Sequence, residues 1–376
     1  MNRLQRLHDA GQSLWLDFIE RTMIHDGDLA RRIREDALTG MTSNPTIFEK
    51  ALAEGSAYDD QVRRDAGGRD ALALFEAVET TDVRDACDQF RGVYDATNGG
   101  DGYVSIEVSP GVAHHAEDTV AEAQRLWKTV DRPNVMIKVP GTEEGAKAVR
   151  TLIAQGINVN ITLLFSLEAY ARVVEAYLAG LEDRVAAGGD VRGIASVASF
   201  FVSRVDTEVD SRLDKLAEGA SDGAALGALK GKAAIANAKM AYQLFLERFS
   251  GPRWEALAAK GARLQRPLWA STSTKNPAYR DVIYVEELIG PNTVNTLPPA
   301  TLEAFRDHGE VAVTVTRDVE GAKADLAALA RIGVDMKDVT DKLLRDGLAS
   351  FQKSFDTLLS GLETKTRALG AALAGR

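Results

Sequence analysis

One lysine lies inside a short apolar segment rich in β-branched residues, where a charge needs a reason. The segment Asn134–Thr142 reads Asn-Val-Met-Ile-Lys-Val-Pro-Gly-Thr, which is typical of a buried strand that stops at a turn. Burial disfavours an ammonium, so Lys138 would present more neutral, nucleophilic amine than an exposed lysine. Such an amine can form a Schiff base with a carbonyl substrate. The structural alternative is a lysine at a strand end whose charge reaches water.

Two carboxylates accompany the lysine in other strand-like segments. Glu107 lies late in Tyr103–Ser109, where it could act as a general acid or base through a water molecule. Its structural alternative is an ion pair with Lys138 or Arg204. Asp17 lies in Ser13–Ile19 and could exchange a proton with a substrate hydroxyl, or it could simply cap a helix or turn the chain.

Amide and hydroxyl side chains are also placed to hold a substrate. Asn160 and Thr162 are two residues apart on one strand, so both face the same way and could position hydroxyls or a water molecule. They could equally be structural residues whose hydrogen bonds are satisfied within a buried polar layer. Asn44, in Thr42-Ser43-Asn44-Pro45, admits the same two interpretations, and Asn-Pro is also a common turn.

A group of cationic and hydroxyl residues follows the sixth and seventh strand-like segments. Arg204 comes directly after Phe200-Phe201-Val202-Ser203, and Ser271 and Lys275 lie at or just after the end of the segment that begins at Pro267. A guanidinium, a hydroxyl and an ammonium suit a phosphate dianion. Late loops of α/β barrels commonly hold phosphate. The alternative is that these residues are ordinary surface charges.

Short β-rich segments alternate with long segments rich in Ala, Leu, Glu and Arg, which predicts βα units and a parallel sheet. We therefore expect an α/β fold, a (β/α)8 TIM barrel with additional helices. An open, doubly wound sheet is disfavoured, because no glycine-rich turn follows the first strand. The eight expected strands are Ser13–Ile19, Leu38–Asn44, Tyr103–Ser109, Val135–Pro140, Ile157–Leu164, Ile194–Phe201, Pro267–Ser273 and Thr293–Leu297.

Alternation within these strands gives each one a polar face and an apolar face. In Ile157–Leu164 the apolar Val159, Ile161 and Leu163 oppose Asn158, Asn160 and Thr162. Helices outside the barrel must cover the apolar faces, so the polar faces would point to the barrel axis. A polar interior that gathers toward the carboxyl ends of the strands predicts a site there.

The chain is expected to be a single barrel domain over residues 1–376, with 301–376 as a C-terminal helical extension packed on the barrel. Apolar residues recur at helical spacing in Asp318–Ile332 and in 340–372, and we expect the last helix to cover the barrel's side or mouth. Gly219–Gly227 is expected to be a loop of small residues or a frayed helix.

Composition excludes several classes of protein. The 376 residues are 45% hydrophobic and carry a net charge of −10, which argues against a nucleic-acid partner. No apolar segment approaches membrane-spanning length, and Met1–Leu14 does not resemble a signal peptide. The single cysteine, Cys87, suits a reducing cytoplasm, and the five histidines show no metal-ligand spacing. We expect a cytoplasmic protein without metal or cofactor.

At these residues the sequence resembles the transaldolase family, and its length resembles the longer bacterial subgroup. The motifs occur in family order. They are Leu14-Trp15-Leu16-Asp17, Thr42-Ser43-Asn44-Pro45, Val104-Ser105-Ile106-Glu107-Val108, Ile137-Lys138-Val139-Pro140-Gly141-Thr142, Asn158-Val159-Asn160-Ile161-Thr162-Leu163-Leu164-Phe165-Ser166, Ser199-Phe200-Phe201-Val202-Ser203-Arg204 and Trp269-Ala270-Ser271-Thr272-Ser273-Thr274-Lys275-Asn276-Pro277.

The resemblance implies a metal-free transfer of a dihydroxyacetone unit between sugar phosphates. Lys138 would form the imine with the ketose phosphate, and Asp17 would take the proton of its C4 hydroxyl as the C3–C4 bond breaks. Glu107, through a water molecule held by Thr162, would carry protons while the imine forms and hydrolyses.

The resemblance also implies binding roles, with one departure. Asn44 and Asn160 would hold hydroxyls of the bound fragment, while Arg204, Ser271 and the nearby Ser199 would hold phosphate. Shorter relatives carry an arginine where this chain has Ser273, and Lys275 is the candidate for the missing charge.

Two rival functions remain at this stage. A related class I aldolase, such as a fructose-6-phosphate aldolase, is the nearest, but those relatives are much shorter, lack a match to Glu107 and have tyrosine in place of Phe201. The other is a sugar-phosphate-binding barrel without catalysis. The expected partners are sugar-phosphate substrates, with the chain acting as a monomer or homodimer.

Overall fold

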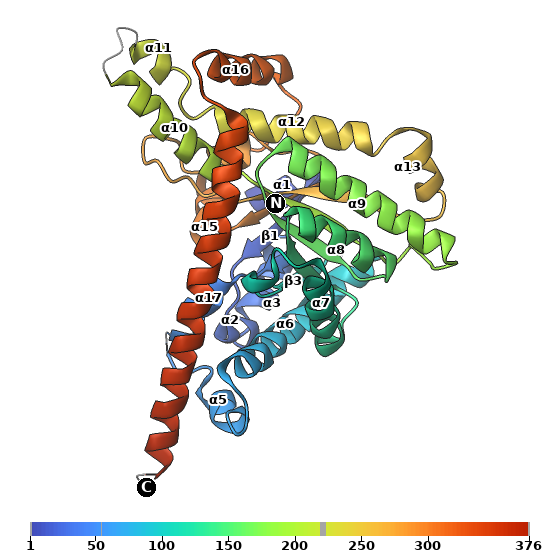
Figure 1. Cartoon of the computed structure of the whole chain (residues 1–376), viewed down its shortest axis with the longest axis vertical. Coiled ribbons are helices and arrows are strands. Elements are labelled where there is room, and N and C mark those ends of the chain that lie inside the picture. The colour runs from blue at the N-terminus through green and yellow to red at the C-terminus, as the bar shows by residue number, and fades with distance from the viewer. Residues whose placement is uncertain (1, 54, 219–222, 375–376) are drawn as a thin grey trace.

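The computed structural model describes residues 2–53, 55–218 and 223–374, and these form a closed barrel of eight parallel strands. Each strand pairs with its neighbour in the chain, and the last returns to the first, so the expected (β/α)8 barrel is confirmed. Figure 1 shows the helices arranged around it. The strands are β1 (Gln12–Asp17), β2 (Leu38–Thr42), β3 (Tyr103–Glu107), β4 (Val135–Pro140), β5 (Val159–Leu164), β6 (Ser196–Phe201), β7 (Gln265–Ala270) and β8 (Thr293–Leu297).

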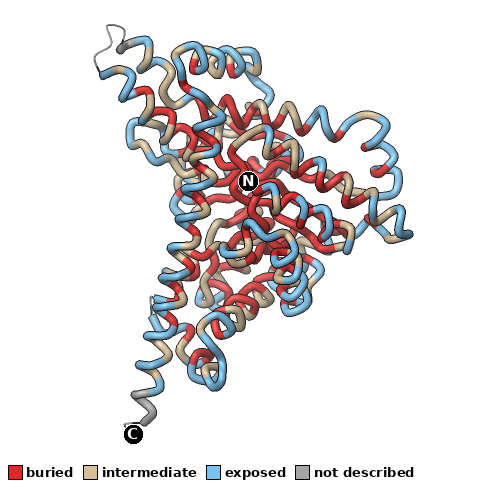
Figure 2. Tube along the Cα trace, viewed as in Figure 1, coloured by how far each residue is buried: buried red, intermediate tan, exposed pale blue. Residues whose placement is uncertain are grey.

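Helices cover the outside of the barrel, and the buried residues gather at its centre (Figure 2). None of the described helices combines the length and apolar character needed to cross a membrane. Of the expected Gly219–Gly227 loop, residues 219–222 lie outside the described residues and the rest is α11. The helices are α1 (Arg3–Asp9), α2 (Arg21–His25), α3 (Asp28–Glu35), α4 (Pro45–Ala53), α5 (Asp59–Asp65), α6 (Ala71–Ala96), η1 (Pro110–Val112), α7 (Ala116–Val130), α8 (Glu143–Ala154), α9 (Leu167–Ala186), α10 (Ser203–Ala217), α11 (Gly223–Gly227), α12 (Ala233–Arg248), α13 (Gly251–Ala258), α14 (Ile283–Glu286), α15 (Pro299–His308), α16 (Val319–Arg331) and α17 (Met336–Ala374).

Six of the eight strands differ from their expected bounds by one to three residues at one or both ends, and two strands carry a left-handed residue near their carboxyl end. The bounds of β4 and β8 are as expected, but β7 stops at Ala270 because Ser271 has a φ of 55°. In β5, Leu163 has a φ of 59°, and the register with β6 shifts between Ile161 and Leu164. Both irregularities lie at the carboxyl end of the barrel, where strain is often kept for function.

A buried tryptophan fills the barrel axis below the carboxyl ends of the strands. Trp15 is fully buried, and its Nε1 donates to Asp101 Oδ1 at 2.8 Å. Arg266 Nη2 lies 3.5 Å from the same oxygen. Gly40 pairs with Trp15 in the register of β1 and β2, and its missing side chain leaves room for the indole. Asp17, two residues beyond Trp15, therefore stands on a rigid floor.

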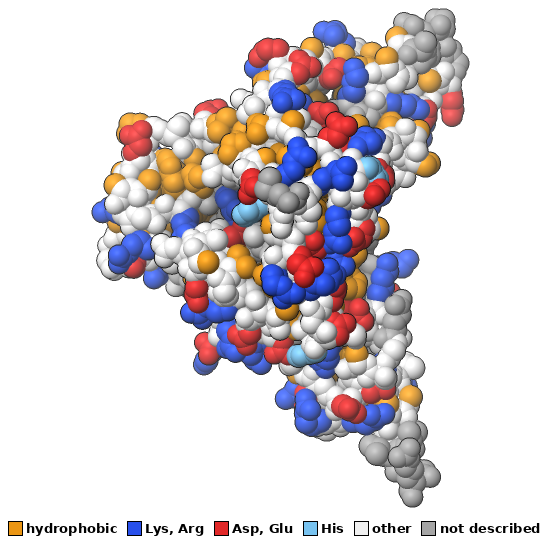
Figure 3. All heavy atoms as spheres, turned by 180° about the vertical axis from the view of Figure 1, so that it is seen from behind, with side chains coloured by type: hydrophobic (Ala, Val, Ile, Leu, Met, Phe, Trp, Pro, Cys, Tyr) orange, Lys and Arg blue, Asp and Glu red, His pale blue; other side chains and the backbone are white. Residues whose placement is uncertain are grey.

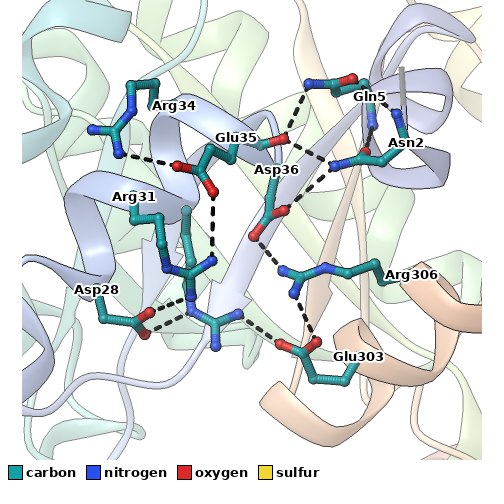
Figure 4. Close-up of polar contacts among 10 residues, drawn as sticks. Asn2, Gln5, Asp28, Arg31, Arg34, Glu35, Asp36, Glu303 and Arg306 are labelled. Atoms are coloured by element: carbon teal, nitrogen blue, oxygen red, sulfur yellow. Dashed lines mark hydrogen bonds and ion pairs between the residues drawn. The ribbon is translucent and has the colours of Figure 1, made fainter.

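Ion pairs fasten the last βα unit to the first (Figure 4). Arg306 of α15 pairs with Asp36 and with Glu303, the latter at 2.9 Å. Glu303 Oε1 also lies 2.9 Å from Arg32 Nη1 of α3. This network of ion pairs ties the elements on either side of the seam between β8 and β1. Elsewhere, on the back of the molecule, acidic and basic side chains are interspersed over the surface (Figure 3).

The long helix α17 runs along the molecule and is fixed near both ends (Figure 1). Arg212 Nη1 of α10 lies 2.7 Å from Asp338 Oδ2, and Lys365 Nζ lies 2.8 Å from Asp59 Oδ1 of α5. Between these points Phe355 packs edge-on against the ring of Phe75 in α6. The helix is thus bound to opposite sides of the barrel.

We expect Gly40→Ala to destabilise the fold. The added Cβ would lie 2.5 Å from Trp15 Nε1, and the fully buried indole has nowhere to move. Overpacking of this kind lowers the free energy of unfolding by about 1–3 kcal/mol. Chemical denaturation would measure it, with Gly67→Ala as control, since nothing lies within 4 Å of a Cβ there. Equal stability of the two variants would contradict this account of the floor.

Candidate active site

A cavity of about 150 Å³ opens at the carboxyl ends of the strands. It gathers side chains from strands spread along the whole barrel. All the site residues expected from the sequence line it except Glu107 and Asn160, which are buried beside it. The lining residues are Asp17, Thr42, Asn44, Lys138, Thr162, Ser199, Phe201, Arg204, Ala270, Ser271, Ser273, Lys275, Thr296, Pro298 and Phe351.

A larger cavity, of about 720 Å³, lies between α9, α12, α16 and α17. Its walls are mainly apolar, with Leu326, Val334 and Met336 among them, and it contains none of the site residues expected from the sequence. Size alone favours this cavity, but chemistry needs convergent polar groups. We therefore place the site in the smaller cavity.

Lys138 and Glu107 form a buried ion pair at the inner end of the smaller cavity. They stand opposite each other in the register of β3 and β4, so both point inward. Lys138 Nζ donates to Glu107 Oε2 at 3.0 Å and to the Ser43 carbonyl at 2.8 Å. Lys138 is 6% exposed and Glu107 7%. The two interpretations of Glu107 are thus compatible, because an ion-paired carboxylate here also touches the amine.

Two polar atoms beside this pair lack a protein partner among the described residues. Glu107 Oε1 and Thr162 Oγ1 are both buried without a hydrogen bond. Burial raises the pKa of Glu107 above its usual value, against the opposing charge of Lys138. Buried polar groups without partners are uncommon, so these two atoms are suited to a water molecule or a substrate.

Asp17 lies at the end of β1 with its carboxylate anchored on the neighbouring strand. Thr42 Oγ1 donates to Asp17 Oδ1 at 2.8 Å and lies 2.8 Å from Thr296 Oγ1. Burial raises the pKa of Asp17, while the charge of Lys138 is the largest influence in the other direction. A carboxyl group with a raised pKa is suited to exchange a proton near neutral pH.

Asn160 is fully buried, and its amide is engaged by the protein. Asn160 Nδ2 donates to Ser105 Oγ at 3.0 Å, and Ser199 Oγ donates to Asn160 Oδ1 at 2.6 Å. The amide therefore orients Ser199, which lines the cavity. Asn44 lines the cavity while its Oδ1 accepts from the Ile47 amide at 3.0 Å, so it also begins α4 as a turn residue.

The outer end of the cavity holds two cations, and the Asp17 carboxylate lies in the same lining. Among the described residues, Arg204 and Lys275 make no ion pair, although both line the same small space. Burial lowers the pKa of Lys275, and the charge of Arg204 lowers it further. Burial also lowers the pKa of Arg204. Two cations held together in this way favour a bound anion.

Hydroxyl groups surround these cations. Ser271 Oγ lies 3.0 Å from Ser203 Oγ, and its left-handed backbone turns the chain around the cavity rim. Lys275 Nζ donates to Ser273 Oγ at 2.5 Å. The Arg204 guanidinium lies over the Phe201 ring, 5.3 Å from its centroid. The residue at the position of the absent arginine, Ser273, thus supports Lys275.

Sequence reasoning missed several residues of the cavity. Thr42 and Thr296 were not assigned roles, although Thr42 lies in a recognised motif, beside Asn44. Phe351 comes from α17, more than fifty positions after the other lining residues. Helical periodicity marks Phe351 as an apolar contact and does not distinguish a cavity wall from a core.

Comparison with known proteins agrees with this arrangement. Residues 14–362 match the family described as Transaldolase/Fructose-6-phosphate aldolase. A transaldolase of Parafrankia sp. (strain EAN1pec) is 51% identical over 371 residues, 98% of each chain. Transaldolase 1 of Streptomyces coelicolor is 52% identical over 96% of this chain and 93% of its own. Transaldolase 2 of Nostoc sp. is 48% identical over 98% of this chain and 99% of its own. The chain therefore belongs to the transaldolase/fructose-6-phosphate aldolase family.

Proposed function

We propose that this cavity transfers a dihydroxyacetone unit from a ketose phosphate to an aldose phosphate through a Schiff base on Lys138. Sedoheptulose 7-phosphate or fructose 6-phosphate is the donor, and glyceraldehyde 3-phosphate or erythrose 4-phosphate is the acceptor. The observation that carries the proposal is the buried amine of Lys138, fixed by Glu107 and Ser43 at the end of a cavity whose other end is cationic.

The proposed first step uses the ion pair as a proton exchanger. Transfer of a proton from Lys138 to Glu107 leaves a neutral amine, which attacks the C2 carbonyl of the donor. The proton returns from Glu107 to the oxygen of the adduct, and water leaves as the imine forms. Glu107 Oε1 and Thr162 Oγ1, which lack protein partners, are placed to hold that water.

The proposed second step breaks the carbon chain. Asp17 takes the proton of the C4 hydroxyl, the C3–C4 bond breaks, and its electron pair passes into the protonated imine, which becomes a neutral enamine. The shortened aldose phosphate leaves. The acceptor aldehyde is then attacked by the enamine and takes the proton back from Asp17. Hydrolysis of the new imine releases the product and restores Lys138.

Phosphate would occupy the outer end of the cavity. Arg204 and Lys275 supply positive charge, and Ser271 and Ser273 supply hydroxyl donors. An anion there relieves the mutual repulsion of the two cations, so binding energy and orientation come from the same contact. A phosphate bound there orients the substrate so that its carbonyl reaches Lys138.

The proposal places the protein in the non-oxidative pentose phosphate pathway of the cytoplasm. Cys87, its single cysteine, is buried and free, as a reducing compartment allows. We expect the protein to act as a monomer or a homodimer.

Borohydride reduction in the presence of fructose 6-phosphate tests the covalent step. We expect a stable adduct on Lys138, located by peptide mass mapping, and neither adduct nor turnover in Lys138→Ala. Lys239→Ala is the matched control, because Lys239 is also buried but bonds the Arg317 carbonyl outside the cavity. A folded wild-type protein without an adduct would refute the Schiff base. Rapid release of free dihydroxyacetone without acceptor would instead indicate an aldolase.

The pH dependence of kcat/KM tests the carboxylates. Each must be ionised to accept a proton, and burial raises both pKa values above the usual 4.5 of Glu107 and 3.8 of Asp17. Activity should therefore fall on acidification at a pH above 4.5, while circular dichroism still shows folded protein. Glu107→Gln should lower kcat by about 10²–10⁴-fold. A profile that stays level down to pH 4 would count against both assignments.

Replacing Lys275 tests the phosphate site. Lys275→Met should lower kcat/KM for erythrose 4-phosphate by about tenfold or more, as expected when a charged hydrogen bond is lost. Activity with unphosphorylated erythrose should change little. The exposed Lys260→Met serves as the control. An equal loss with both acceptors would show that Lys275 does not contact phosphate.

A further inference from the structure

One wall of the cavity comes from the C-terminal helix α17. Phe351 lines the cavity together with Lys138 and Arg204, and its side chain is 7% exposed. The other lining residues lie between Asp17 and Pro298, on the strands, on the loops that follow them and, for Arg204, in the first turn of α10. The ring of Phe351 is therefore a cover that a separate helix lays over the barrel's site.

Contacts on either side of Phe351 hold α17 close to the barrel. One turn earlier, a Cβ on Gly347 would lie 3.0 Å from a methyl group of Leu163 and 3.8 Å from Arg204 Nη1. One turn later, Phe355 packs edge-on against Phe75, with ring centroids 5.9 Å apart. Glycine at 347 lets the backbone approach the barrel closely, so Phe351 reaches the cavity.

The enclosed space is small for the proposed substrates. Small-molecule sites usually enclose about 300–1,000 Å³, and this one encloses about 150 Å³. A space of this size leaves little room around a bound donor, so the cavity walls constrain the donor's shape.

Two ends of a bound donor have fixed positions under the proposed function. Its carbonyl carbon bonds to Lys138, and its phosphate lies by Arg204 and Lys275. A seven-carbon donor has one more carbon between these points than a six-carbon donor, so its chain must bow outward. The walls on β4 and β6 are held by strand pairing, and Phe201 also packs against Phe165. Phe351 is a side chain on a helix, which can yield.

We propose that Phe351 is a specificity-determining residue that sets the relative use of six-carbon and seven-carbon ketose phosphate donors. The inference rests on the proposed function and adds a substrate-sorting role for α17. A large ring at this position disfavours the longer donor, and a smaller side chain admits it.

The test compares kcat/KM for sedoheptulose 7-phosphate and fructose 6-phosphate with one acceptor. Phe351→Ala should raise the seven-carbon to six-carbon ratio by about tenfold, the lower end of the range for a methylene-sized difference in an apolar pocket. Phe351→Leu should shift the ratio the same way by less, and Phe351→Trp should lower it. These two variants keep the test decisive if the alanine variant folds poorly.

Phe355→Ala is the matched control. Phe355 is on the same helix and is 8% exposed, but it does not line the cavity. Its loss should reduce stability and leave the ratio unchanged. An unchanged ratio in the Phe351 variants, or an equal shift in Phe355→Ala, would overturn the proposal. Borohydride trapping on each variant separates this outcome from failure of the proposed function, in which wild type itself forms no adduct.

Discussion

The site depends on one ammonium and one carboxylate held together away from bulk water. Removing two charges from water is expensive, and close pairing with further hydrogen bonds must offset it. Parallel strands β3 and β4 place Lys138 and Glu107 directly opposite each other, and the Ser43 carbonyl accepts a second hydrogen bond from the lysine. Loss of one partner leaves the other charge buried and unpaired, which lowers the free energy of unfolding by about 3–5 kcal/mol. The same pair that the barrel must stabilise is the pair best placed to exchange a proton.

The opposite end of the cavity is arranged by the reverse logic. Arg204 and Lys275 line one small space and make no ion pair in the described part of the chain, although Asp17 lines the same cavity. At the inner end, opposite charges stabilise each other before a substrate arrives. At the outer end, like charges repel until an anion joins them. The two cations thus favour an anionic ligand locally, in a chain whose net charge is −10.

The sequence predicted what depends on local pattern and missed what depends on distant packing. Two-residue alternation placed Glu107 and Lys138 on inward faces, and their pairing follows from that. Alternation could not show that Asn160 spends its amide on Ser105 and Ser199, because rotamers and neighbours decide that. Nor could periodicity place Phe351 in the cavity, since an apolar helix position packs equally well against a core.

The seam between the two ends of the barrel has a consequence for how the chain matures on the ribosome. Strand β1 pairs with β8, and Asp36 pairs with Arg306, which is synthesised some 270 residues later. Until then the first strand has an open edge, a hazard for association with other nascent chains. Helix α17, which carries Phe351, is translated later still. A polypeptide cut short after β8 would carry Lys138 in a cavity that lacks the Phe351 wall, so the cavity is complete only once α17 has been made.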